Sequence, residues 1–425
     1  MSSFRKDIII TATSQVVLLV IALILNKLLG SVLTVEEFGV MSLARRSTSV
    51  LTFVIAAGMG IAIPRYLAFA NSDSKQKEDK SYIMLSGIII ITVIGCLTYF
   101  VINIFELRIL NIVFGESYKN SQVLYAMFSY AFSSAYLTYL YAYFRGNDRV
   151  YLFSFFQIIV NLFIMIALFF NTKIISILWI WSGISYLGCL VISTYIFISD
   201  RDLFILKINI KKLKQYIGEM LSYCLPRIAG EFLLFSFTLI PLIIINNKLD
   251  ITNSSYFSVT TSLIAMFNPI FSFIGISLLS FVSKAYQKRQ YEIIKIQIHK
   301  FIKLYLLVAI IIVGFVCLFS EILLSLLYSP IYVEAAKYLK IVSFTLIPNS
   351  MYLLLRNPID AITTKPLNTY SLIFSTVFLL IMLFLSNTPF EFAITYVLSY
   401  GILGGSSIVF IKRLFKEMNI KEEVK

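Results

Sequence analysis

Long apolar runs separated by short connections constrain this sequence more than any other feature. The 425 residues are 59% apolar or aromatic and 14% charged, whereas soluble domains are about 45–50% apolar and about 25% charged. Twelve runs approach the roughly 20 apolar residues that a membrane-spanning helix needs. These values exclude an ordinary soluble enzyme and a disordered chain, and they predict an all-α integral membrane protein.

The twelve predicted spans leave no connection long enough to fold as a separate domain. The second span is weakened by Arg45 and Arg46, and the tenth by Lys340 and Pro348. The approximate ranges are 8–29, 38–63, 81–104, 122–144, 151–170, 174–199, 219–246, 252–282, 301–326, 338–355, 369–386 and 391–411.

The basic residues fix the predicted orientation. With the N-terminus inside, the inner segments hold 26 of the 36 Lys and Arg residues and the outer segments hold seven. Cytoplasmic loops of membrane proteins carry such an excess, so both termini are predicted to be cytoplasmic. The net charge of +14 then reflects inner loops, and no nucleic-acid partner is expected.

An internal repeat divides the chain into two halves. Residues 109–118 read ILNIVFGESY and residues 323–332 read LLSLLYSPIY, an offset of 214. Each stretch follows the third span of its half, so the repeat unit is six spans. An even number predicts two six-helix bundles related by a pseudo-two-fold axis along the membrane normal, with a substrate path between them. A monomer then suffices.

The repeat predicts two domains and a junction. The N-terminal bundle is expected at 1–199 and the C-terminal bundle, with a short basic tail, at 219–425. The junction, 200–218, is basic and amphipathic, which predicts a cytoplasmic linker on the inner leaflet.

The residues that carry metal or nucleotide chemistry are scarce. The four cysteines lie in apolar runs, and His299 is the single histidine, so no metal site or cofactor is expected. The sequence has no Gly-rich phosphate loop ending in Lys-Ser/Thr, hence no ATP motor. Asp200-Arg201-Asp202 resembles the DxD of glycosyltransferases, but no catalytic domain surrounds it.

Arginines inside predicted spans are the strongest candidate site. A charge in a span costs about 2.5–3.5 kcal/mol on insertion scales and usually faces a cavity or a partner. Arg45, Arg46 and Arg227 could form a cationic cavity for an anionic head group, because guanidinium binds phosphate bidentately. The alternative is that Arg227 pairs with Glu231 and that one of the adjacent arginines extends to the outer interface.

Other residues extend this candidate site. Gln157 and Asn161 share a helix face and are predicted to line the same cavity. Glu231 is a candidate for coupling to H⁺ or Na⁺. Five glycines are expected to permit close helix contacts: Gly58, Gly60, Gly401, Gly404 and Gly405.

Several short motifs resemble one membrane-protein family. They are Leu33-Thr34-Val35-Glu36-Glu37-Phe38-Gly39-Val40 after the first span, Gly58-Met59-Gly60, Arg65-Tyr66, FGESY at 114–118 and Arg-Gly-Asn-Asp-Arg at 145–149. With twelve spans and the repeat, the chain resembles the Wzx-type O-antigen and polysaccharide flippases. These form the polysaccharide transporter branch of the multidrug/oligosaccharidyl-lipid/polysaccharide (MOP) exporter superfamily.

The resemblance implies a role in polysaccharide biosynthesis, for O-antigen and lipopolysaccharide. Such a protein moves a polyprenyl-pyrophosphate-linked oligosaccharide from the inner to the outer leaflet of the cell inner membrane by alternating access. The implied partners are the lipid-linked oligosaccharide, the bilayer and other polysaccharide-assembly membrane proteins. Loss of surface glycan on substitution of Arg227 by alanine is the expectation for this role.

Two alternatives remain from the sequence. A cation-coupled multidrug or metabolite exporter of the same superfamily is expected to need acidic cavity residues, whereas Arg outnumbers Glu in these spans. A membrane polysaccharide polymerase is expected to carry a long outer loop with catalytic Arg or His. The longest outer loop, at roughly 105–121, lacks that chemistry.

Overall fold

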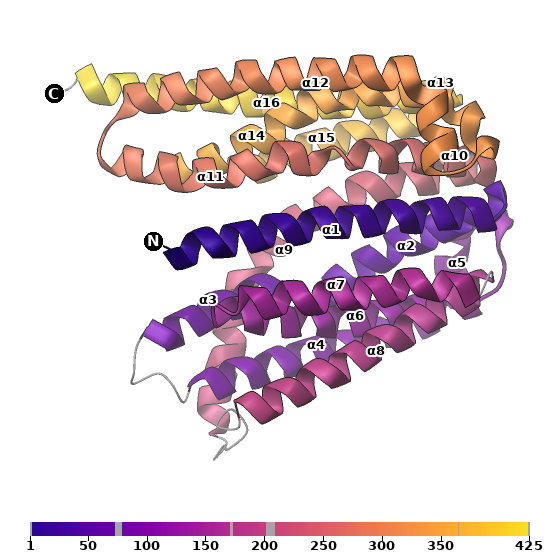
Figure 1. Ribbon diagram of the computed structural model, residues 1–425, viewed down its shortest axis with the longest axis horizontal. Helices are drawn as coiled ribbons and strands as arrows, with labels where there is room; N and C mark the ends of the chain where they lie inside the picture. Colours follow the sequence, from indigo (N-terminus) through magenta and orange to yellow (C-terminus); the bar gives the residue numbers. More distant parts are fainter. Residues whose placement is uncertain (1, 73–78, 171–172, 201–208, 364, 424–425) are drawn as a thin grey trace. The chain divides into compact units, whose positions relative to one another are not determined.

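The computed structural model describes residues 2–72, 79–170, 173–200, 209–363 and 365–423. Within these residues the chain is nearly all helical and contains no strand (Figure 1). Nine helices of the described part are long and apolar enough to cross a membrane. The predicted all-α membrane fold is therefore confirmed, while the side on which the termini lie stays a prediction. The chain divides into two compact units, Met1–Phe235 and Ser236–Lys425.

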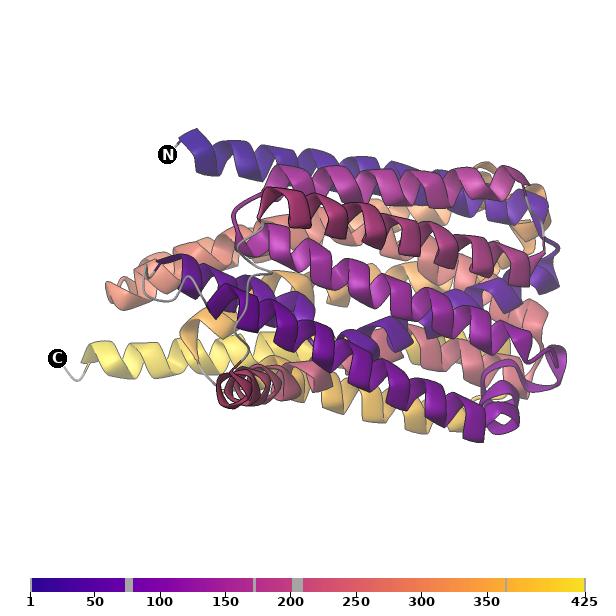
Figure 2. The ribbon, with the colours of Figure 1, turned by 90° about the horizontal axis from the view of Figure 1, so that it is seen from below.

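The first unit contains the helices of the first six predicted spans and the start of the seventh. In Figures 1 and 2, α1 and α7 of this unit lie side by side. Its elements are α1 (Ser2–Val32), α2 (Val35–Ala56), α3 (Met59–Ser72), α4 (Asp79–Ile104), α5 (Glu106–Phe114), η2 (Gly115–Ser117), α6 (Gln122–Gly146), α7 (Val150–Ile166), η3 (Ala167–Phe170), α8 (Ile174–Ser199) and the beginning of α9 (Ile210–Lys248).

The second unit contains the end of α9 and the remaining helices. Within it α14 packs against both α11 and α16. Its other elements are α10 (Ile251–Ala265), α11 (Asn268–Gln287), α12 (Tyr291–Leu327), η5 (Pro330–Ala335), α13 (Ala336–Val342), η6 (Ser343–Thr345), α14 (Leu346–Ile362), α15 (Leu367–Leu385) and α16 (Pro389–Glu423).

The backbone repeats in the register that the sequence predicts. In the first unit α4 ends before Phe105, whose φ and ψ are −109° and 21°. In the second unit α12 bends at Phe319, whose φ and ψ are −108° and 18°. The two residues are 214 positions apart, the offset of the sequence repeat. The second span of each unit is also broken, into α2 and α3 and into α10 and α11.

The break between α2 and α3 depends on a glycine. Ala57 and Gly58 both have positive φ, 47° and 72°, a region that residues other than glycine rarely adopt. An added Cβ at Gly58 would lie 3.0 Å from both Cβ and Sγ of Cys224 in α9. Glycine at position 58 therefore allows both the positive φ and the close approach of α9.

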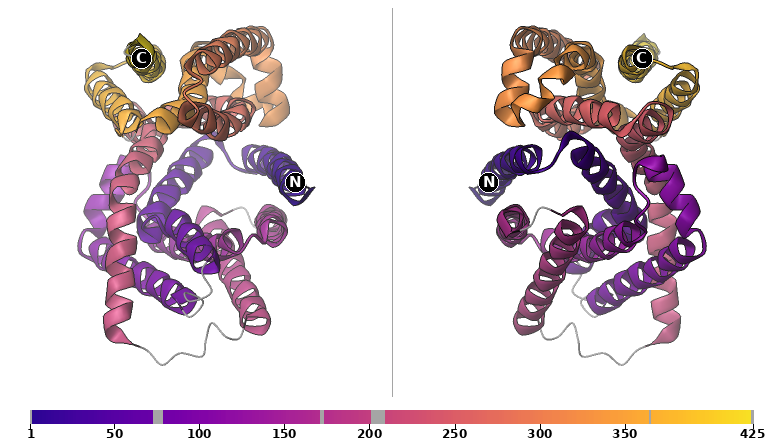
Figure 3. Two further views of the ribbon diagram at one scale, coloured as in Figure 1. Left: turned by 90° about the vertical axis from the view of Figure 1, so that its left-hand side faces the viewer. Right: turned by 90° about the vertical axis from the view of Figure 1, so that its right-hand side faces the viewer.

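The first part of α9 runs across the shared direction of the other first-unit helices (Figure 3). Lys212 forms an ion pair with Asp79 at the start of α4, and its Nζ lies 5.2 Å from the centroid of the Tyr82 ring. Tyr66 of α3 donates a hydrogen bond of 3.3 Å to the carbonyl of Glu219. Within the predicted linker, residues 201–208 lie outside the described residues, and from Ile210 the chain is already helical.

The motif that follows the first span is a helix cap. Thr34 Oγ1 accepts a hydrogen bond of 3.3 Å from Glu37 N, and Glu37 Oε2 accepts one of 3.0 Å from Thr34 N. This reciprocal capping box satisfies two backbone donors at the start of α2. Phe38, the next residue, is 3% exposed. The cap and this buried ring fix how the chain enters α2, the helix that carries Arg45.

The Arg-Gly-Asn-Asp-Arg motif links four helices. Arg145, at the end of α6, donates a hydrogen bond of 2.8 Å to the carbonyl of Gly60 in α3. Arg149 binds both carboxylate oxygens of Asp200, at 2.8 and 3.2 Å, and Tyr143 also donates to Asp200. Asp200 therefore joins the ends of α6, α7 and α8, which is a structural role.

Candidate functional site

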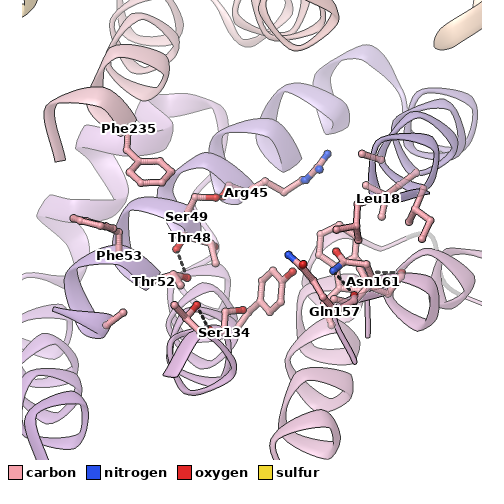
Figure 4. A pocket seen from close by; sticks show the side chains of 18 of the residues that line it. Leu18, Arg45, Thr48, Ser49, Thr52, Phe53, Ser134, Gln157, Asn161 and Phe235 are labelled. Atoms are coloured by element: carbon pink, nitrogen blue, oxygen red, sulfur yellow. Dashed lines mark hydrogen bonds between the residues drawn. The ribbon is translucent and has the colours of Figure 1, made fainter. Parts of the chain in front are cut away.

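A cavity of about 660 Å³ lies within the first unit (Figure 4). Its volume falls in the range of about 300–1,000 Å³ that is usual for small-molecule sites. Helices α1, α2, α6, α7, α8 and α9 contribute its wall. The lining residues are Gln15, Leu18, Ile21, Ala22, Leu25, Arg45, Thr48, Ser49, Thr52, Phe53, Ala56, Tyr130, Ser134, Thr138, Gln157, Asn161, Ile164, Trp181 and Phe235.

Arg45 is the one charged side chain among these lining residues, and they include no acid. Its guanidinium extends from α2 toward the side of the cavity that Leu18, Gln157 and Asn161 line (Figure 4). Arg45 lies ten residues after the start of α2, or about 15 Å along the helix. The positive charge of the cavity therefore lies well away from the start of α2.

Two neighbours stabilise this guanidinium. Nη1 of Arg45 donates a hydrogen bond of 2.9 Å to Oδ1 of Asn26 in α1, and Cζ lies 5.8 Å from the ring centroid of Trp181 in α8. The indole nitrogen of Trp181 donates to the carbonyl of Ile164 at 3.0 Å, which fixes the ring. A cation over an indole is stabilised by about 0.5–2 kcal/mol. These contacts offset part of the cost of a charge in a span.

Hydroxyl groups line the wall beside Arg45. Thr52 donates to the carbonyl of Thr48 at 2.8 Å, and Ser49 to the carbonyl of Arg45 at 3.0 Å. Thr138 in α6 likewise donates to Ser134 at 2.9 Å. A hydroxyl that donates to its own helix offers the cavity only acceptor lone pairs. Ser49, Thr52 and Thr138 therefore offer an anion no proton, whereas Arg45 does.

The amides of α7 supply the other polar groups. Asn161 donates one hydrogen bond of 2.8 Å to the carbonyl of Gln157. Oε1 of Gln157 and Oγ1 of Thr48 are buried without a hydrogen-bond partner in the part of the chain that the structure describes. Leaving a buried polar atom unsatisfied costs about 1–3 kcal/mol, so these groups favour a polar ligand or water. No group of three His, Cys, Asp or Glu side chains that could hold a metal occurs among the residues searched, which are the described ones.

The structure brings together three of the six residues predicted from the sequence. Arg45, Gln157 and Asn161 line one cavity. Arg46 is half-buried in α2 and is not among the lining residues. Arg227 and Glu231 belong to α9, but their side chains lie outside the described residues, so their predicted roles stay predictions.

Sequence reasoning missed Asn26 and Trp181, which position Arg45. Trp181 is 1% exposed, and an aromatic residue inside an apolar run carries no functional signal in the sequence. Asn26 did carry a functional signal, because burying a lone amide within an apolar span costs free energy unless the amide has a hydrogen-bond partner. Its partner lies 19 residues away on another helix, and a single sequence does not show that pairing.

The chain resembles known proteins in sequence and in fold. A family model described as "Polysaccharide biosynthesis protein" matches residues 4–275, and the MatE model matches residues 226–385. A search of curated proteins finds no match.

Three solved structures illustrate the structural similarity. An inward-facing multidrug resistance MATE family transporter of the MOP superfamily has a TM-score of 0.78 at 14% identity, over 95% of this chain and 96% of that one. An outward-facing transporter of the same description has a TM-score of 0.63 at 14% identity, over 98% and 96%. A MOP superfamily transporter from Pyrococcus furiosus has a TM-score of 0.63 at 12% identity, over 98% and 95%.

The first family model covers more than half of the chain, and the structural matches cover nearly all of it. At such low identity the structures establish the fold, and the family model establishes the relationship. The chain therefore belongs to the polysaccharide biosynthesis protein family and is a multi-pass membrane transporter of the MOP-superfamily fold, not an enzyme.

Proposed function

We propose that the protein is a flippase that moves a polyprenyl-pyrophosphate-linked oligosaccharide from the inner to the outer leaflet of the cell inner membrane. The observation that carries this proposal is Arg45, the single charge among the described residues that line the first-unit cavity. The family's link to polysaccharide biosynthesis supports it. The glycan would be O-antigen or a related surface polysaccharide.

The charge of the cavity separates an anionic substrate from a cationic one. At an effective dielectric of about 20, a monocation about 6 Å from Arg45 would be repelled by about 3 kcal/mol, and a monoanion attracted equally. The repulsion corresponds to about a 100-fold loss of affinity for a cationic drug. The Pyrococcus furiosus transporter is itself described as having a binding pocket of reverse polarity that suggests a different function.

Arg45 would act by lowering the cost of bringing the pyrophosphate into the membrane. A guanidinium can form two parallel hydrogen bonds with phosphate oxygens. Polar groups such as Gln157, Asn161 and Thr48 would contact the sugars, while the lipid tail stays in the bilayer. An inside-negative potential favours outward movement of anions by about 2.3 kcal/mol per charge per 100 mV.

Alternating access of the two bundles would expose the cavity first to one side and then to the other. Arg227 would add a second cation to the path, and Glu231 is the candidate for coupling to H⁺ or Na⁺. Neither role is needed for the Arg45 proposal. One chain supplies both bundles, so a monomer suffices.

The proposal is tested in cells that lack the gene and carry a variant copy. Arg45→Gln should cause lipid-linked oligosaccharide to accumulate in the inner leaflet and surface glycan to fall at least tenfold. Arg46→Gln is the matched control, because it removes the same charge from the next residue, which does not line the cavity. Equal glycan in the two variants, with both proteins present at equal levels, would contradict the proposal.

A second candidate function is export of cationic drugs or metabolites, which the MatE match over residues 226–385 favours. Deletion of the gene would then lower resistance to cationic compounds and leave surface glycan unchanged. The flippase proposal predicts the reverse pattern. The same strain, scored for both properties, therefore separates the two functions.

A further inference from the structure

A second cavity, of about 240 Å³, lies at one end of the second unit. It is formed where α11 ends, where α14 connects to α15, and along the last turns of α16, an end that also holds the α11–α12 connection (Figure 1). Its polar lining residues are Tyr286, Thr363, Lys365, Arg413 and Glu417. This cavity is distinct from the one that contains Arg45, which belongs to the first unit.

Two cations converge on this cavity from different elements. Lys365 lies in the connection before α15, and Arg413 lies in α16. Neither forms an ion pair with any residue that the structure describes. Glu417 is the single acid among the described lining residues, so the cavity carries a net positive charge. Two like charges on one small cavity repel each other unless an anion lies between them.

Neutral hydrogen-bonding groups complete the cavity wall. Thr363 Oγ1 accepts a hydrogen bond of 3.2 Å from the backbone N–H of Lys365, which leaves its own O–H able to donate. Leu367, the first residue of the 19-residue helix α15, also lines the cavity. The backbone N–H of Leu367 donates to the carbonyl of Lys365 at 2.8 Å, so this residue contributes its side chain to the wall. Two cations and a hydroxyl donor therefore line the same small volume.

Further cations lie near this cavity. Lys284 and Lys288 lie at the end of α11, and Lys412 and Lys416 flank Arg413 on α16. The sequence predicts that this end of the unit is cytoplasmic. Basic pockets between membrane helices on that side bind anionic lipid head groups.

We infer that this cavity is a phosphate-binding site, separate from the transport cavity, in which Lys365 and Arg413 hold a phosphate group at the predicted cytoplasmic face. The phosphate could come from an anionic phospholipid of the inner leaflet or from a soluble phosphate. Both sources present the same oxygens to the two cations. The inference is independent of the proposed flippase function.

The test measures ligand-dependent thermal stabilisation of the purified full chain in a neutral detergent. A ligand that binds only the folded state raises Tm by an amount that grows with the logarithm of its concentration divided by Kd. The probes are dioleoylphosphatidylglycerol, dioleoylphosphatidylcholine and inorganic phosphate. The pocket variant is Lys365→Gln with Arg413→Gln. The matched control is Lys412→Gln with Lys416→Gln, which removes the same charge at the same end without touching the lining.

Phosphatidylglycerol or inorganic phosphate should stabilise the wild type and the control, and bind the pocket variant about 25-fold more weakly, at about fivefold per cation. An effect of phosphatidylglycerol alone identifies a lipid head group, and an effect of inorganic phosphate identifies a soluble source. Either result supports the site. If the double variant does not fold, each single variant should show the fivefold loss.

Equal affinity of the pocket variant and the control for the ligand would overturn the inference. It would mean that the ligand responds to the overall surface charge and not to Lys365 and Arg413. The absence of any stabilisation of the wild type by phosphatidylglycerol and by phosphate would overturn it as well. Phosphatidylcholine, which is electrically neutral, should have no effect that depends on these two side chains.

Discussion

Substitution of Gly404 by alanine should destabilise the second unit. Gly404 of α16 faces α14, and an added Cβ would lie 2.3 Å from the carbonyl oxygen of Pro348 and 2.8 Å from its C and Cα atoms. An ordinary contact between carbon and oxygen is about 3.3–3.6 Å. The two helices would therefore have to separate by about 1 Å, because all three contacting atoms belong to the backbone and no side chain can rotate away.

Two effects of opposite sign decide the magnitude. Alanine is favoured over glycine within a helix by about 1 kcal/mol, whereas overpacking of a close contact costs about 1–3 kcal/mol. The 2.3 Å contact places Gly404→Ala at the costly end, so we expect a net loss of about 1–2 kcal/mol. At Gly405 an added Cβ meets no atom of the described residues within 4 Å. Gly405→Ala should therefore stabilise the protein by up to about 1 kcal/mol, the helix preference of alanine over glycine.

Thermal unfolding of the purified proteins in one detergent compares these neighbours directly. The expected order of Tm is Gly404→Ala below the wild type, and Gly405→Ala equal to it or above it. If the two variants unfold at the same temperature, the close packing of α16 on α14 is refuted. The sequence predicts close helix contacts at five glycines. This prediction is wrong for Gly401 and Gly405, because no atom of the described residues lies within 4 Å of an added Cβ at either position.

Three further substitutions probe the first unit. Thr34→Ala removes the capping box with Glu37 and should lower stability by about 1 kcal/mol, seen as a lower Tm; an unchanged Tm would exclude a role for the cap. Asp200→Asn weakens the partly exposed pair with Arg149 and should cost about 1 kcal/mol with surface glycan retained; loss of glycan in a stable protein would instead indicate a functional carboxylate. Gly58→Ala should cost about 1–3 kcal/mol through its positive φ and its crowding, and a wild-type Tm would disprove the strain.

The spans were predictable because long apolar runs mark them in the sequence. Each of the twelve predicted spans corresponds to a helix or to a broken pair of helices. The bends at Phe105 and Phe319 lie 214 residues apart, which is the offset of the predicted repeat, but the bends themselves were not predicted. The break at Ala57 was not predicted, because a glycine such as Gly58 can mark either a helix break or a close contact between helices.

The candidate site was predictable in its residue types and not in its geometry. Adjacent residues of a helix point about 100° apart, so the sequence could not tell which of Arg45 and Arg46 faces the cavity. Packing against α1 and α8 decides it, through Asn26 and Trp181. These partners come from distant parts of the chain, and their contacts depend on the rotation of each helix, which a hydrophobic pattern fixes only loosely.

The central claim is that Arg45 carries the anionic substrate through the first-unit cavity. The most direct measurement reconstitutes the purified protein in liposomes with a fluorescent polyprenyl-pyrophosphate-linked sugar and follows its movement between leaflets with a membrane-impermeant quencher. We expect rapid movement with the wild type and Arg46→Gln, partial movement with Arg45→Lys, and at least a tenfold slower rate with Arg45→Gln. A wild-type rate with Arg45→Gln would contradict it.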